Sequence, residues 1–231
     1  MVPAELTTER AARRGKFITF EGPEGGGKTT QLELLRRYLA SRGVEALCLR
    51  EPGATIISER IRDLLLDREL GELSARTEAL LFCAARAELV ASRIWPALRA
   101  GRVVLCDRYT DSTLAYQGYG RGLPVSELAA VNRFATGGLE PDLTLCLDVP
   151  VEVGLRRKAA ANETNRMEAE GLAFHERVRR GFLELAARQP QRWRIIDATQ
   201  APHAVAMAAR QHVDAILEEA LGHETDHKHR E

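Results

Sequence analysis

The stretch GPEGGGKTT, residues 22–30, constrains the fold of this chain more than any other segment. It lies between the apolar run FITFE and the helical run QLELLRRYLASRG. Gly22, Gly27, Lys28 and Thr29 fit the phosphate-loop pattern G-x-x-x-x-G-K-[ST]. In this pattern, glycines let backbone N–H groups converge on an anion at a helix N-terminus, the lysine adds a cation, and the Thr hydroxyl can ligate magnesium. We therefore predict a site for a nucleoside triphosphate with Mg²⁺ rather than a flexible glycine-rich turn.

The composition excludes several classes of protein. The chain has 231 residues, and its 33 Lys and Arg balance its 33 Asp and Glu, so no overall field recruits nucleic acid or an acidic membrane. The cysteines are far apart in apolar runs and form no C-x-x-C pair, which is typical of reduced thiols in a cytoplasmic protein. No apolar segment approaches the ~20 residues of a membrane span. We predict a cytoplasmic protein that binds neither nucleic acid nor membrane.

The length and the polar ends indicate one domain with two peripheral extensions. A chain of this size can bury one generous core. Both ends are polar, and such ends are poorly ordered unless other contacts hold them. We expect a flexible extension over residues 1–15, a single domain over 16–217 and a polar tail over 218–231.

Short apolar runs alternate with helical stretches along the chain. The runs KFITFE, VEALCLR, GRVVLCDR, DLTLCLDV and RWRIIDA are each followed by a helical pattern. This alternation predicts an α/β, three-layer P-loop NTPase fold, in which a central parallel five-stranded sheet is flanked by helices.

Two further segments lack an apolar strand pattern. Residues 72–99 predict a long helix that begins near Ser74 and is kinked or ended near Pro96. Residues 156–170 are polar and carry both charges, which favours a short mobile lid, although a solvated connection between helices has the same composition.

A charged pair follows the third apolar run. In a parallel sheet, ligands bind beyond the carboxyl ends of the strands, which is where this pair should lie. The pair is Asp107 and Arg108. A cation beside the phosphate loop favours an anionic acceptor over water, because an arginine guanidinium can bind two oxygens of a phosphate at once. A structural ion pair is the alternative. The chain also lacks the N-K-x-D guanine motif of GTPases. Together these features favour a small-molecule kinase over a GTPase or a motor ATPase.

Several separated segments resemble the motifs of bacterial thymidylate kinases, which are P-loop nucleoside monophosphate kinases. The resemblance extends from Lys16 to Leu217. It implies that ATP, with Mg²⁺, gives its γ-phosphoryl group to dTMP, forming dTDP and ADP for dTTP synthesis, and that the chain forms a homodimer. The segments are FEGPEGGGKTTQ, REPGAT, LLLD, LFCAARAELV, DRYTDSTLAYQGYGRG, PDLTLCLDVPVEVGLRR, FHERVRRGFLELA and IIDAT.

The resemblance assigns the donor side of the site. It places Lys28 at the ATP phosphates, Thr29 and Glu24 at the metal, and Glu24 also near the acceptor sugar. The backbone of the segment IIDATQ is placed beside adenine, although Asp197 or Thr199 could equally cap the last helix. The residues expected to bind ATP are Gly22, Pro23, Glu24, Gly25, Gly26, Gly27, Lys28, Thr29, Thr30, Ala198 and Thr199.

The resemblance also assigns the acceptor side. Phe82 and Arg86 lie on one face of a helix, so the ring can stack on thymine while the guanidinium binds a carbonyl oxygen. Without the family, a core Phe82 and a surface Arg86 would be favoured. Arg108 is assigned to the dTMP phosphate, and Tyr116 to the 2′ position of the sugar. The other residues expected there are Arg50, Glu51, Pro52, Thr113 and Gln117.

The catalytic residues implied by the resemblance include a lid cation, because the phosphate loop contains no arginine. The candidates for this cation are Arg156, Arg157, Lys158 and Arg166. We expect Arg157 first and Arg166 next to act with Lys28, Arg108 and Glu24. The lid departs from some relatives, which carry arginines where this chain reads AAAN.

Two alternative functions remain open from the sequence. The nearer is a kinase for another nucleoside monophosphate or for a deoxynucleoside, which base selectivity would distinguish. The farther is a nucleotide-dependent switch, which would hydrolyse ATP slowly with no dependence on an acceptor.

Overall fold

A computed structural model describes residues 14–67, 69–71, 73–160, 167 and 170–227, with side chains up to residue 218. It contains the predicted five-stranded sheet, in which all neighbouring strands are parallel and the order is β2-β3-β1-β4-β5. Strands that are covered on both faces are apolar almost throughout, which explains the uninterrupted apolar runs. The strands are β1 (Phe17–Glu21), β2 (Ala46–Arg50), β3 (Val103–Asp107), β4 (Leu143–Asp148) and β5 (Trp193–Asp197).

Helices connect these strands and cover both faces of the sheet. The described helices are α2 (Lys28–Ser41), α3 (Ile56–Leu66), α4 (Ala75–Leu89), η1 (Val90–Ile94), α5 (Trp95–Arg99), α6 (Thr110–Thr113), η2 (Leu114–Gly120), α7 (Val125–Thr136), α8 (Val151–Ala160), α9 (Leu172–Arg188) and α10 (Pro202–His227).

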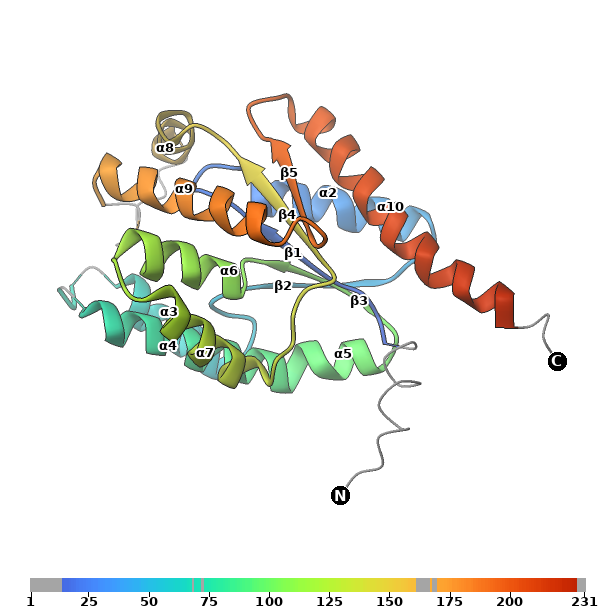
Figure 1. Cartoon of the computed structure of the whole chain (residues 1–231), viewed down its shortest axis with the longest axis horizontal. Coiled ribbons are helices and arrows are strands. Elements are labelled where there is room, and N and C mark those ends of the chain that lie inside the picture. The colour runs from blue at the N-terminus through green and yellow to red at the C-terminus, as the bar shows by residue number, and fades with distance from the viewer. Residues whose placement is uncertain (1–13, 68, 72, 161–166, 168–169, 228–231) are drawn as a thin grey trace, which may run out of the picture.

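Three layers result from the two apolar faces of the sheet. On one face, Ile18 and Leu145 share a buried cluster with Leu35 of α2 and Val213 of α10. On the other face, strand residues such as Val104 pack against η1 and α5, while α9 covers β4 and β5. In Figure 1, α4, α5 and α7 lie below the strands and α10 extends to the right. The three-layer arrangement predicted from the sequence is confirmed.

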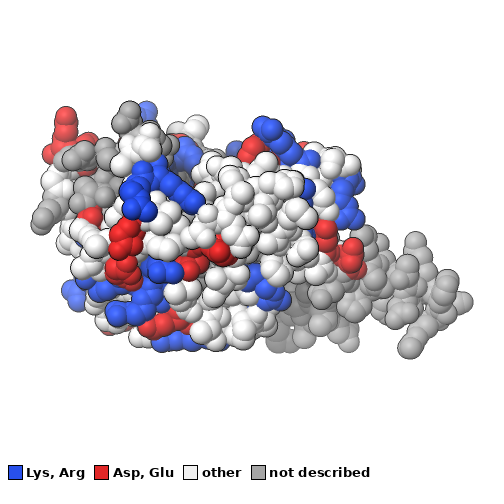
Figure 2. Space-filling model, turned by 90° about the horizontal axis from the view of Figure 1, so that it is seen from above, with Lys and Arg blue, Asp and Glu red and all other residues white. Residues whose placement is uncertain are grey.

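The surface carries charges of both signs. Figure 2 shows basic and acidic side chains gathered beside one another on the face seen from above, while much of the rest of that face carries neither. Within the described part of the chain, no helix is long and apolar enough to cross a membrane.

Some element boundaries differ from the prediction. The helix expected over 72–99 consists of α4, the π-helical η1 and α5 in succession. Ser74 caps it as predicted, since its Oγ accepts the N–H of Thr77 at 3.1 Å, and Pro96 lies in the first turn of α5, where a missing N–H is tolerated. The first part of the expected lid is helical because α8 continues to Ala160. Helix α10 continues to His227, beyond the expected boundary at 217.

Two glycines let α8 pack directly against the phosphate loop. A Cβ at Gly154 would collide with the carbonyl oxygen of Glu24, and a Cβ at Gly25 would collide with the backbone of Gly154. Gly25 also has a φ of 68°, in the left-handed region that favours glycine. This contact places the C-terminal half of α8, with its cationic side chains, next to the loop.

Gly154→Ala should therefore destabilise the protein even though alanine is the better helix former. The collision should cost about 1–3 kcal/mol and outweigh a helix-propensity gain of about 1 kcal/mol. Urea unfolding measures the free energy. Gly171→Ala is the matched control, because a Cβ there meets open space. An unchanged or higher stability of Gly154→Ala would show that the loop and α8 are not held together in this way.

Candidate active site

The phosphate loop, residues 22–30, connects β1 to α2 as the motif predicts. Gly27 is the N-cap of α2 with a φ of 82°, a value that glycine adopts without the steric cost of a Cβ. Lys28 is buried, and its Nζ donates to the carbonyl oxygens of Gly22 at 3.1 Å and Pro23 at 2.8 Å. Burial, followed by the charge of Arg108, lowers the pKa of Lys28 to about 8. These contacts hold the amine of Lys28 against the loop.

Thr29 and Asp107 place two oxygen ligands beside this loop. The Thr29 hydroxyl donates to Oδ2 of Asp107 at 2.7 Å, and Asp107 ends β3. Proteins commonly hold Mg²⁺ through one or two carboxylates together with substrate phosphates and water, so this pair fits the predicted ion. Among the described residues, no group of three or more His, Cys, Asp or Glu could hold a metal by itself. The strand end had marked Asp107, but sequence reasoning did not assign it to the metal.

Arg108 lies against the phosphate loop. Its Nη2 donates to Oε1 of Glu24 at 2.6 Å and to the Tyr116 hydroxyl at 3.1 Å, and its Nη1 is 3.3 Å from the carbonyl oxygen of Gly22. The Tyr116 hydroxyl also donates to Glu24, at 2.8 Å. Burial by itself raises the pKa of Glu24, but Arg108, Lys28 and Tyr116 outweigh it and lower this pKa to about 2. Glu24 is therefore a paired carboxylate and not an exposed loop residue.

A second carboxylate holds the turn that carries Arg108. Glu21 is fully buried, and it accepts the backbone N–H of Tyr109 at 2.8 Å and the hydroxyl of Ser112 at 2.6 Å. Ser112 accepts in turn from Arg108 at 3.1 Å. Arg108 has a φ of 70°, which costs a non-glycine residue about 1–2 kcal/mol, so these contacts must hold the turn in place. Burial, followed by the charge of Asp111, raises the pKa of Glu21 to about 8.

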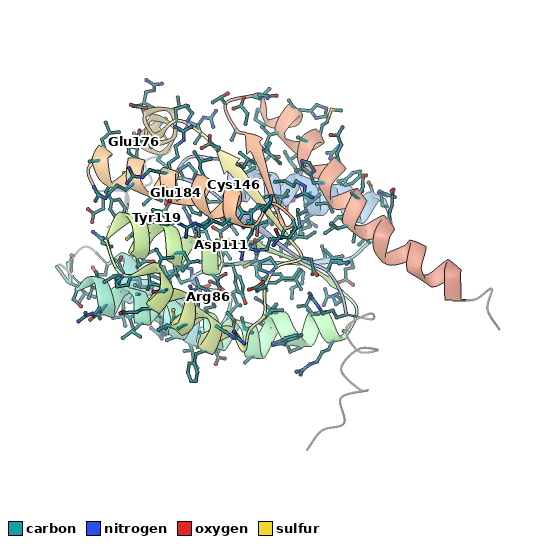
Figure 3. The ribbon with its side chains drawn as sticks, viewed as in Figure 1. Arg86, Asp111, Tyr119, Cys146, Glu176 and Glu184 are labelled. Atoms are coloured by element: carbon teal, nitrogen blue, oxygen red, sulfur yellow. The ribbon has the colours of Figure 1, made fainter. Side chains whose placement is uncertain are left out.

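Phe82 and Arg86 share one face of α4, as their spacing predicts. Arg86 exposes only 1% of its surface and lies inside the molecule, so the interpretation of a surface cation is wrong (Figure 3). Its Nε donates to Oε2 of Glu51 at 2.7 Å. Burial raises the pKa of Glu51 to about 7, and Arg86 opposes this rise. The other donors of Arg86 bind the Thr113 hydroxyl at 3.0 Å, the Asn132 side-chain oxygen at 2.6 Å and the Tyr109 carbonyl oxygen at 2.9 Å.

A cleft of about 930 Å³ collects most of the residues expected from the sequence. Of those that the structure describes, only Gly22, Pro23 and Thr199 do not line it. The phosphate loop and Arg108 are therefore continuous with the wall that carries Phe82 and Arg86. Lys158, a candidate lid cation, and Gln200, at the end of the segment placed beside adenine, also line the cleft. Sequence reasoning did not assign the other lining residues, which are Gln31, Arg62, Leu66, Asp107, Ser112, Met167, Pro202 and Val205.

The cations of α8 approach the cleft from above the phosphate loop. Nη1 of Arg157 donates to the carbonyl oxygens of Gly25 at 3.2 Å and Ala198 at 2.9 Å. Lys158 also lines the cleft. Arg166, the second expected lid cation, lies outside the described residues.

The polar side chains of the turn after β5 bond to each other. Asp197 accepts the backbone N–H of Thr199 at 2.9 Å and its hydroxyl at 2.6 Å, so both side chains stabilise this turn. Ala198 lines the cleft between them. The turn can therefore present backbone to a ligand while its polar side chains are engaged with each other.

Comparisons with known proteins agree with the motifs. A family model described as Thymidylate kinase matches residues 20–209. The chain is 57% identical over 202 residues to Thymidylate kinase of Thermomicrobium roseum, covering 87% of this chain and 95% of that protein. It is 51% identical over 208 residues to Thymidylate kinase of Desulfovibrio desulfuricans, covering 87% and 96%. A crystal structure of thymidylate kinase from Ehrlichia chaffeensis matches with a TM-score of 0.71 at 33% identity, covering 87% of this chain and 99% of that one.

Glu21 should make stability depend on pH. Its pKa is 4.5 when unperturbed and about 8 in the folded protein, so its stabilising contribution is complete below pH 4.5 and is lost as the pH rises through 8. Glu21→Gln keeps the size of the side chain but does not titrate. Wild type should lose stability relative to this variant by up to about 1.4 kcal/mol per pH unit across that window.

Urea unfolding across this pH range checks the prediction. Glu33→Gln is the control, because Arg36 and Arg37 lower the pKa of Glu33 to about 2, and this variant should run parallel to wild type above pH 4.5. Parallel curves for wild type and Glu21→Gln would contradict the assignment.

Proposed function

The chain belongs to the thymidylate kinase family and is a nucleoside monophosphate kinase, and we propose how its cleft moves the γ-phosphoryl group of ATP to dTMP. The products are dTDP and ADP. Family membership supports dTMP as the acceptor and weighs against a nucleotide-dependent switch. The observation that carries the proposed roles is the position of Arg108, whose Nη1 is 3.3 Å from a carbonyl oxygen of the phosphate loop.

On the donor side, the loop N–H groups and Lys28 would hold the ATP phosphates at the N-terminus of α2. The two contacts of Lys28 with its own loop support this role. Thr29 and Asp107 would hold Mg²⁺, which neutralises charge on the donor phosphates when bound. The adenine would lie against the backbone around Ala198, which lines the far end of the cleft.

On the acceptor side, Arg108 would bind the phosphate of dTMP. This phosphate has a second pKa near ~6, so it is mostly a dianion at neutral pH and needs no general base. The bonds of Glu24 with Arg108 and Tyr116 support a role in orienting that guanidinium. Catalysis would then rest on alignment and on preorganised charge.

The base and sugar would bind against the wall beyond Arg108. Phe82 would stack on thymine, and Arg86 would donate to a carbonyl oxygen of the base. Tyr116 would crowd the 2′ position and so disfavour ribonucleotides. These three side chains line the same cleft, which supports this arrangement. The wall is completed by Arg50, Glu51, Pro52, Thr113 and Gln117.

Arg157 would bring positive charge to the transferring phosphoryl group, because the phosphate loop has no arginine. Its bond to the carbonyl oxygen of Gly25 supports this role by placing the guanidinium at the loop. Arg166 is a second candidate for this role, supported only by its position in the sequence. When α8 and the following segment approach the substrates, water should be excluded and wasteful hydrolysis of ATP suppressed.

Arg108→Met should separate transfer from ATP binding. Loss of the fork that holds the acceptor should lower kcat/KM for dTMP by roughly 100- to 1,000-fold, while the Kd for ATP changes little. Steady-state kinetics and titration with a fluorescent ATP analogue measure the two quantities. Arg102→Met is the control, since it removes an exposed guanidinium that is paired with Glu45 outside the cleft. Unchanged turnover of Arg108→Met, or an equal loss of ATP affinity, would overturn the assignment.

We also propose that the protein is a homodimer that uses the outer faces of α4 and α7. These helices pack together, and Leu80 on α4 is 58% exposed while Phe134 on α7 is 91% exposed. Large apolar side chains so exposed on adjoining helices favour burial against a second copy.

Phe134→Lys should therefore convert a dimer to a monomer in sedimentation equilibrium, because a lysine would be buried without a partner charge. Leu172→Lys changes another exposed leucine, on α9, and should leave the dimer intact. A monomeric wild type, or a dimeric Phe134→Lys, would contradict the proposal.

We further propose a cytoplasmic location, which the four free cysteines support. Recovery of the protein outside the cytoplasmic fraction of lysed cells would contradict it.

A further inference from the structure

Glu78 lies one helical turn before Phe82 on α4, on the same face of the helix as Phe82 and Arg86. It is fully buried although it is a carboxylate. Its Oε1 accepts from Nε2 of Gln117 at 2.8 Å, and Gln117 lines the cleft with Phe82 and Arg86. Burying a carboxylate costs free energy of folding, so Glu78 needs a positively charged partner as well as this hydrogen bond.

Arg121 supplies the balancing charge. Its Nε and Nη2 each lie 3.2 Å from a different oxygen of Glu78. An ionised carboxylate can only accept hydrogen bonds, so the NH₂ end of the Gln117 amide must face Glu78. The amide oxygen of Gln117 is thereby directed away from Glu78. Among the described residues it has no hydrogen-bonded partner, and it is available at the cleft wall.

A donor accompanies this acceptor. Arg86 has five N–H groups, and four of them bind Glu51, Thr113, Asn132 and the carbonyl oxygen of Tyr109. Arg86 also lines the cleft. The wall of the proposed base pocket thus carries the amide oxygen of Gln117 beside the guanidinium of Arg86, which is a donor only.

This pattern matches one class of pyrimidine. Thymine and uracil present an N3–H donor beside a carbonyl oxygen at C4. Cytosine presents the reverse, an N3 acceptor beside an amino group at C4, and would leave groups on both sides unpaired.

We propose that Glu78 is a specificity-determining residue that acts through Gln117, because it fixes the side-chain amide with its oxygen towards the cleft and so selects bases that carry an N3–H. This inference rests on the proposed base site. Glu78 does not touch the base, and it discriminates by preventing the amide of Gln117 from turning over to present its NH₂ group to a cytosine.

Glu78→Gln tests the proposal, because a neutral amide can pair with either end of Gln117. The ratio of kcat/KM for dTMP to that for dCMP should fall by roughly tenfold or more. The ratio for dTMP to dUMP should stay constant, since those two bases present the same N3–H and C4 carbonyl. A structural effect alone would lower all three activities by the same factor, and that result would overturn the proposal.

Three further variants sharpen the test. Glu78→Asp keeps a carboxylate and should retain the selectivity of wild type. Glu88→Gln makes the same chemical change on the same helix outside the cleft and should alter no ratio. If Glu78→Gln does not fold, Glu78→Met can replace it in the test, because methionine also leaves the Gln117 amide free to turn over. This variant should show the same loss of selectivity.

Gln117→Leu separates this inference from the proposed base site beneath it. If Gln117→Leu leaves kcat/KM for dTMP unchanged, the base site itself is wrong. If Gln117→Leu lowers that value but Glu78→Gln leaves the dTMP to dCMP ratio unchanged, the base site stands and the orienting role of Glu78 is wrong.

Discussion

The parallel pairing of β1 with β3 determines where the charged groups of the cleft lie. Phe20 is opposite Asp107 in this ladder, and the N–H of Arg108 donates to the carbonyl oxygen of Phe20 at 2.9 Å. The phosphate loop begins where β1 ends, so the ladder itself brings Arg108 against the loop. Backbone hydrogen bonds therefore set the separation of the proposed donor and acceptor phosphate sites, and rigid placement of this kind lets a kinase rely on alignment.

This arrangement requires charges to be buried, and burial is tolerated only where each charge has a partner. Glu24 is paired with Arg108, while the buried Glu21 accepts two hydrogen bonds from the turn that holds Arg108 in its left-handed conformation. Arg86 and Glu51 form a second buried pair in the wall of the cleft. Glu24 and Glu51 thus hold arginines in fixed orientations, which fits the substrate-binding roles that we propose for Arg108 and Arg86.

Local patterns predicted much of this structure. The five apolar runs gave the strands, Ser74 marked the start of α4, and the spacing of Phe82 and Arg86 placed them on one helix face. Contacts between distant segments were not predictable in this way. The Arg86 to Glu51 pair, the bond of Thr29 to Asp107 and the approach of α8 to the loop each depend on how the sheet orders its strands. Ala54 has a left-handed φ of 65°, which its local sequence does not reveal.

We propose that one cleft holds ATP and dTMP so that the γ-phosphoryl group passes directly between them. The most direct measurement follows ATP consumption with magnesium in the presence of each nucleoside monophosphate, and identifies the diphosphate formed. We expect dTMP to accelerate this consumption most strongly and dTDP to appear in an amount equal to that of ADP. Consumption that is independent of any acceptor, or that another monophosphate accelerates more than dTMP, would contradict it.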